Sequence, residues 1–190
     1  MRDGYNELVI DALNETKQRD TILICNRYLN GFVLNPYTQL DKAIRMDNKN
    51  YNPTGGTPLY DETLVLLGTV VAKSQEFTGN GVPVRTITLI ITDGADEHSR
   101  RATPAMVKKV VDDMLKAENN IIAALGIDDG GRTDFREVFR EMGLRDEWIL
   151  TPGNSKSEIR RAFQVFSRSA IRASQSAANF TKAATGGFGN

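Results

Sequence analysis

Two short apolar runs constrain the fold of this chain more than any other feature. Residues Thr86 to Ile91 and residues Ile121 to Ile127 show no regular alternation of apolar and polar side chains. Such runs are typical of strands that are buried on both faces, as in a parallel sheet covered by helices. Segments with apolar residues at helical spacing separate the strands, and this alternation predicts an α/β protein.

The rest of the chain extends the same pattern. The expected elements are a helix near residues 5–13, strands at 21–25 and 32–34 joined by an Asn30-Gly31 turn, helices at 57–73, from Thr103-Pro104 onward and at 135–142, a strand at 148–150, and a helix after the capping box Ser155–Glu158. We expect three layers, with a doubly wound, mostly parallel sheet and one antiparallel edge strand. Residues 1–170 are expected to form this domain, and residues 171–190, rich in Ala, Ser and Gly, a low-complexity flexible tail.

Composition excludes several classes of partner. Lys and Arg together number 24, as do Asp and Glu, so no basic excess favours nucleic acid. No apolar stretch approaches the roughly 20 residues that span a bilayer, so no membrane partner is expected. The only cysteine, Cys25, can form no internal disulfide. These features predict a cytoplasmic protein of one domain.

Two loops carry the chemistry. The segment Thr54–Asp61, which reads TGGTPLYD, opens a helix, and Ile91–Glu97, which reads ITDGADE, closes a strand. The hydroxyl of Thr57 and the carboxylate of Asp93 are hard oxygen ligands of the kind that Mg²⁺ accepts. The alternatives are that Thr57 is a plain helix cap and that Asp93 belongs to an ordinary Asp-Gly turn. For three further acidic side chains, Asp61, Asp96 and Glu97, exposure to solvent is the simplest expectation.

With these two loops in this element order, residues 1–170 resemble the von Willebrand factor A domain of the bacterial intracellular type, a Rossmann-like fold. The resemblance implies a metal-ion-dependent adhesion site (MIDAS) that binds Mg²⁺ or Mn²⁺ with ligands from three loops. Thr57 matches the threonine of such a site and Asp93 its aspartate. The first loop, an Asp-x-Ser-Gly-Ser-Met type segment after the opening strand, has no counterpart in this sequence.

The resemblance also implies that a central strand is missing. That strand would lie between the strands at residues 21–26 and 86–92, and Met1 would occupy the position of the motif methionine, as in a truncated or split reading frame. We therefore expect a metal site that is weak or absent in this form. We also expect a chain that is unstable alone or is complemented by a strand from another chain.

Three classes of function remain open. The first is an interaction module, in which the acidic side chain of a partner protein completes the coordination of the cation. The second is a metal-free structural fragment, or half of a split protein. The third is a metal-dependent phosphoester hydrolase that would use Asp93 and Asp96. Because the sequence contains no P-loop and no zinc-type cluster of His and Cys, we expect no enzyme.

Overall fold

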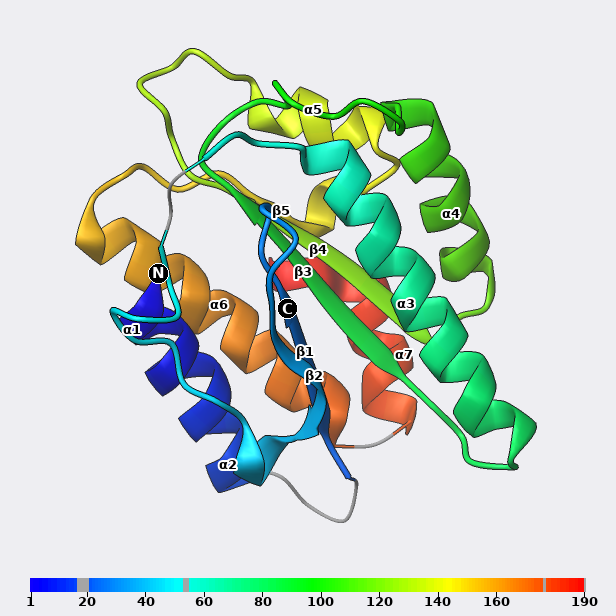
Figure 1. Cartoon of the computed structure of the whole chain (residues 1–190). Helices are drawn as coiled ribbons and strands as arrows, with labels where there is room; N and C mark the ends of the chain where they lie inside the picture. Colours follow the sequence, from blue (N-terminus) through cyan, green and yellow to red (C-terminus); the bar gives the residue numbers. More distant parts are fainter. Residues whose placement is uncertain (17–20, 53–54, 176, 190) are drawn as a thin grey trace.

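The computed structural model has three layers, with strands between two layers of helices (Figure 1). It describes residues 1–16, 21–52, 55–175 and 177–189. The helices are α1 (Arg2–Tyr5), α2 (Ala12–Thr16), α3 (Leu59–Gly79), α4 (Pro104–Lys116), α5 (Phe135–Glu141), α6 (Lys156–Ser174) and α7 (Ala177–Gly186). A π-helical stretch, Asn6–Asp11, joins α1 to α2, and short 3₁₀ turns cover Leu40–Lys42, Asp146–Trp148 and Gly187–Gly189.

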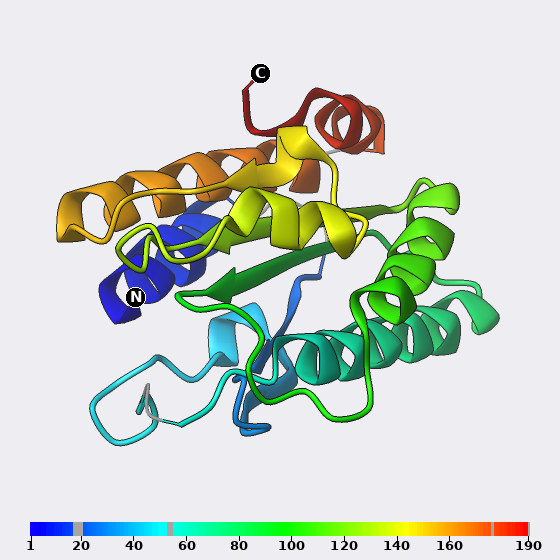
Figure 2. The same cartoon turned by 90° about the horizontal axis from the view of Figure 1, so that it is seen from above.

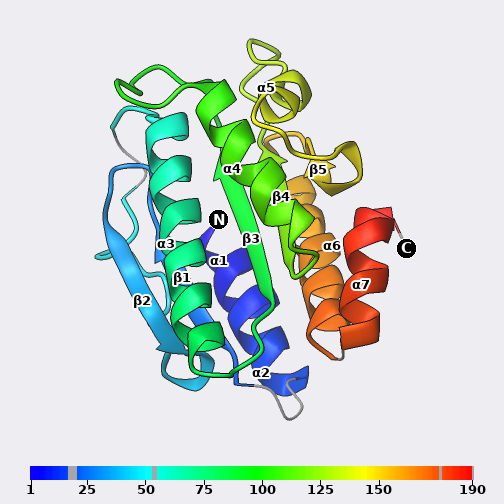
Figure 3. The same ribbon diagram turned by 90° about the vertical axis from the view of Figure 1, so that its right-hand side faces the viewer.

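In the described residues, five strands form two separate sheets. The strands β3 (Thr86–Thr92), β4 (Asn120–Gly126) and β5 (Ile149–Leu150) make a parallel sheet in that order. The strands β1 (Leu23–Arg27) and β2 (Val33–Gln39) make an antiparallel hairpin. In Figure 3 the hairpin lies on the side of β3 that is opposite to β4. The predicted α/β class and the antiparallel hairpin are therefore present, although the strands do not form one continuous sheet.

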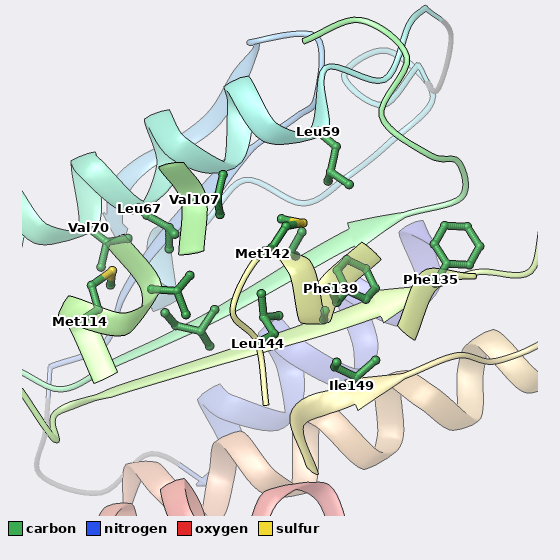
Figure 4. Close-up of a cluster of buried hydrophobic side chains, with 14 residues drawn as sticks. Leu59, Leu67, Val70, Val107, Met114, Phe135, Phe139, Met142, Leu144 and Ile149 are labelled. Atoms are coloured by element: carbon green, nitrogen blue, oxygen red, sulfur yellow. The ribbon is translucent and has the colours of Figure 1, made fainter. Parts of the chain in front are cut away.

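The core fills both spaces between strands and helices. On one face α3, α4 and α5 cover the parallel sheet with the apolar cluster shown in Figure 4, which includes Leu67, Val107 and Phe139. On the other face the N-terminal helices and α6 cover it, as the view from above shows (Figure 2). All seven residues of β4 are buried, as its unbroken apolar run predicts.

Local signals at helix ends agree closely with the structure. The hydroxyl of Thr103 accepts a hydrogen bond from the amide of Met106, and Pro104 follows at the first helical position. The Ser155 hydroxyl accepts from the amide of Glu158, as the predicted capping box requires. These caps depend on residues only three apart, so the sequence alone specifies them.

A buried polar network fixes the hairpin to the N-terminal helix. The Tyr5 hydroxyl donates to Asn26 Oδ1 at 2.7 Å, and Asn35 Nδ2 donates to the same oxygen at 2.8 Å. Asn35 is fully buried, and its own Oδ1 accepts from the amide of Ile44. Burial raises the pKa of Tyr5 to about 12, so its hydroxyl stays protonated and continues to donate.

The sequence predicts a flexible tail over residues 171–190, of which residues 176 and 190 lie outside the described residues, and in the rest the structure has helices. Helix α6 continues to Ser174, and α7 packs against it. Phe180 is only 2% exposed, and the Phe188 ring meets the Trp148 ring edge-on with centroids 4.9 Å apart. The expectation rested on composition, but alanine is the strongest helix former and its small side chain permits close packing on α6.

Replacing Phe180 tests whether α7 belongs to the folded domain. We expect Phe180→Ala to lower the free energy of unfolding by about 3 kcal/mol, because a fully buried ring leaves a cavity. The exposed Lys182 on the same helix provides the control variant Lys182→Ala, which should change little. Urea denaturation followed by circular dichroism measures both. Equal stability of the two variants would contradict the docking of α7.

Candidate functional site

The candidate site lies at the carboxyl end of β3, where the strand ends in a tight turn. The buried Thr92 hydroxyl donates to the carbonyl of Gly94 at 2.7 Å and accepts from the amide of the same residue at 3.2 Å. This turn leaves Asp93 exposed at the end of the strand. The amide of Ile127 donates to the Thr92 carbonyl, so β4 ends at the same edge of the sheet.

The loop that carries Thr57 lies against the loop that follows Asp93. The amide of Thr57 donates to His98 Nδ1 at 3.1 Å, and the Thr57 carbonyl accepts from the amide of Glu97 at 3.2 Å. The Thr57 hydroxyl oxygen lies 3.7 Å from the point where a Cβ on Gly94 would stand. The structure therefore brings the two predicted ligand residues, Thr57 and Asp93, to the same edge.

Glycine at position 56 permits this close approach. A Cβ on Gly56 would stand 2.4 Å from the imidazole ring of His98, which is closer than real side chains come. Gly55 has a φ of 118°, a backbone conformation that favours glycine, whereas at Gly56 the space that a Cβ would need is taken by the His98 ring.

Thr57 does not cap α3. The helix begins at Leu59, and the preceding Pro58 provides no side-chain cap. Instead, the loop after β3 caps it from a distance: Asp96 Oδ1 accepts from the amide of Tyr60 at 3.2 Å, and Ser99 Oγ accepts from the amide of Asp61 at 2.9 Å. The alternative in which Thr57 is a plain cap is therefore wrong. So is the expectation that Asp96 is simply solvated.

Asp61 completes a reciprocal clamp between α3 and this loop. Its carboxylate accepts hydrogen bonds from three successive backbone amides, those of Arg100, Arg101 and Ala102, at 2.9, 3.1 and 2.6 Å. These bonds, with that from Arg100 the largest influence, hold the pKa of Asp61 below its usual value. The expectation of a merely exposed first-turn carboxylate is thus corrected. We call this arrangement of Asp61, Asp96 and Ser99 the rim clamp.

The neighbouring loop at residues 128–133 is closed on itself. Asp128 Oδ1 accepts from the amides of Gly130 and Gly131. Asp129 accepts from the amides of Arg132 and Thr133 and from the Thr133 hydroxyl. Because the amide of Asp128 donates to the carbonyl of Pro152, the loop is tied to the segment after β5. The carboxylates of Asp128 and Asp129 therefore stabilise the turns of this loop.

A cavity of about 340 Å³ opens beside the Thr57 and Asp93 loops and extends between β1 and β3. Both residues line it, as do Gly55 and Gly56. Tyr51 stands nearby: burial raises the pKa of its hydroxyl first of all, and the charge of Asp93 raises it further. The cavity therefore connects the edge that carries Thr57 and Asp93 with the interior of the protein.

The donor set for a cation is small. Thr57 and Asp93 offer two oxygen ligands, whereas Mg²⁺ takes six in an octahedron and usually keeps several waters. Within residues 1–16, 21–52, 55–175 and 177–189, no three His, Cys, Asp or Glu side chains form a metal-binding group. Thr57 and Asp93 alone therefore leave most of the coordination of a cation to water or to a partner.

Comparison with known proteins finds no family model that matches this sequence and no curated protein that matches it. In the part of the chain that the structure describes, no helix is long and apolar enough to cross a membrane.

The pH dependence of stability tests the rim clamp. Because the folded-state pKa of Asp61 is depressed, its contribution is present above the unfolded value of about 3.9 and is lost as pH falls through the folded value. We expect Asp61→Asn to destabilise the protein at pH 6, with a smaller difference from wild type at pH 3. Urea titrations at both values measure it, with Asp41→Asn at an exposed turn as control. A difference that is the same at both pH values would contradict the clamp.

Proposed function

We propose that this chain is a protein-interaction module of the von Willebrand factor A type, which binds a partner through a divalent cation at the carboxyl edge of its sheet. The single observation that carries the proposal is the convergence of Thr57 and Asp93, 36 positions apart in the sequence, at one mouth of one cavity. In this proposal their oxygens hold Mg²⁺ or Mn²⁺, and an acidic side chain of the partner supplies a further ligand.

The rim clamp supports a binding role. A site that must present an open coordination position to a protein needs rigid loops, and here the loops are held by hydrogen bonds that do not involve Thr57 Oγ1 or the Asp93 carboxylate. The proposal keeps a cytoplasmic setting, which suits a chain whose one cysteine can form no internal disulfide.

The hydrolase alternative has less support. It would use Asp93 with Asp96, yet the Asp96 carboxylate already accepts hydrogen bonds from the Ser99 hydroxyl and from the amide of Tyr60. A carboxylate engaged in capping a helix is poorly suited to hold a cation or activate water. We therefore propose a binding module and no catalytic activity.

Paramagnetic broadening by Mn²⁺ tests the cation site, since it detects and locates even weak binding. In amide NMR spectra of the ¹⁵N-labelled chain, we expect Mn²⁺ to broaden first the resonances of residues 55–57 and 93–98. Excess Mg²⁺ should reverse the effect. With only two protein ligands, we expect a dissociation constant on the order of 1 mM.

Matched variants identify the ligands. Asp93→Asn and Thr57→Val should each weaken the broadening at this edge about tenfold or more. Glu97→Gln, at an exposed side chain of the same loop, should leave it unchanged. Broadening centred on other acidic residues, or broadening that persists in Asp93→Asn, would overturn the assignment of the cation to this edge.

A further inference from the structure

In the part of the chain that the structure describes, the two sheets present facing edges that are paired with no strand. In the described residues β3 is hydrogen-bonded to β4 alone, and β1 to β2 alone. Backbone donors and acceptors of a strand point alternately to its two sides, so β3 directs half of its polar groups away from β4. An unpaired strand edge is a template for another strand.

The cavity occupies the space between these edges. One side is lined by residues 24–30, from β1 and the segment that follows it, and the opposite side by residues 87 and 89–93, from β3 and its turn. Phe163 and Phe166 of α6 line one face, and Thr63 and Leu66 of α3 line the other. The cavity therefore has a strand on each side and a helix layer above and below, which is the environment of a central strand in a three-layer fold. We call it the strand slot.

Charge in the strand slot is balanced along most of its length. Arg27 and Glu62, both in its lining, form an ion pair with each other at 2.5 Å. Asp93 also lines it, together with apolar side chains such as Leu66, Leu89 and Phe166 and uncharged polar ones such as Asn26, Tyr28 and Thr63. Because burying an unpaired charge is costly, the complementary occupant is uncharged and apolar along its middle.

Two further observations point to a missing occupant. All five residues of β1 are only half-buried, whereas every residue of β4 is buried. The hydroxyl oxygen of Tyr28, which lines the strand slot, is buried and has no hydrogen-bond partner among the described residues. Buried polar atoms are rarely left without a partner, so this hydroxyl favours a polar backbone group nearby.

We propose that the strand slot binds an extended, uncharged and apolar segment of a separate polypeptide, which hydrogen-bonds to β1 and β3 and joins the two sheets into one. The lengths of β1 and β3, five and seven residues, set the length of the occupant at about five to seven residues. Its composition resembles that of β4, the fully buried strand of this chain. The inference goes beyond the proposed cation site, because no metal is required for it.

A synthetic peptide tests the proposal. The probe is acetyl-Lys-Gly-Ile-Val-Leu-Val-Ile-Gly-Lys-amide, added to the full chain in the presence of EDTA and followed by amide hydrogen exchange. We expect exchange to slow about tenfold or more in residues 23–27 and 86–92, with the outer strands β2 and β5 unchanged. The rate of alkylation of Cys25, which lines the strand slot, should fall by a similar factor.

Two controls separate strand addition from simple apolar adhesion. The same peptide with alternate backbone nitrogens methylated keeps its side chains but loses the donors on one edge, and we expect it to give no protection. In the protein, Leu66→Arg places a charge in the slot wall and should weaken binding tenfold or more. Val65→Arg, at the next residue of α3 but 43% exposed and outside the slot, should not. Circular dichroism checks that both variants fold.

Several outcomes would overturn the inference. They are equal protection by the methylated peptide, protection confined to β2 or β5, equal effects of Leu66→Arg and Val65→Arg, and a self-associated chain whose slot amides are already protected without peptide. The last would show that a second copy fills the slot. Because the measurement is made in EDTA, and Asp93→Asn should bind the peptide as wild type does, it can fail or succeed independently of the cation site.

Discussion

The free edge of β3 is the constraint on which the rest of this structure depends. Seven residues of β3 are paired in parallel with β4, while the opposite edge faces β1 across a cavity rather than across a ladder of hydrogen bonds. Among the described residues no strand pairing joins the two sheets, and the network of Tyr5, Asn26 and Asn35 ties the hairpin to the N-terminal helix. Those side-chain bonds fix the position of the hairpin even though the backbone ladder between the sheets is open in the described chain.

At the carboxyl edge of the sheet, hydrogen-bonded loops carry two oxygen-bearing side chains that take no part in those hydrogen bonds. The hydrogen bonds of Asp61, Asp96 and Ser99 fix α3 to the loop after β3. The Thr57 hydroxyl and the Asp93 carboxylate lie beside this framework and take no part in it. Thr57 and Asp93 both line the strand slot, so an occupant of the slot would lie next to the proposed cation site.

Much of the fold could be predicted from sequence because its signals are local. The apolar runs gave β3 and β4 within a residue at each end, and the caps at Thr103 and Ser155 involve residues three apart. The rim clamp could not be predicted, because it joins residues 36 to 41 positions apart and leaves no local pattern. The helix at residues 177–186 could not be predicted for a different reason: the composition of this segment is typical of disorder, whereas the structure buries Phe180.

The contact between the C-terminal turn and the rest of the protein has a spectroscopic consequence. Trp148 is the only tryptophan of the chain, its ring lies against that of Phe188, and its indole nitrogen donates to the carbonyl of Ala184 at 3.2 Å. The intrinsic tryptophan fluorescence of this protein therefore reports on one region, the contact of α7 and the turn after it with Trp148. Detachment of that helix would redden the emission while the secondary structure seen by other methods remained nearly whole, so an emission shift alone is no measure of global unfolding here.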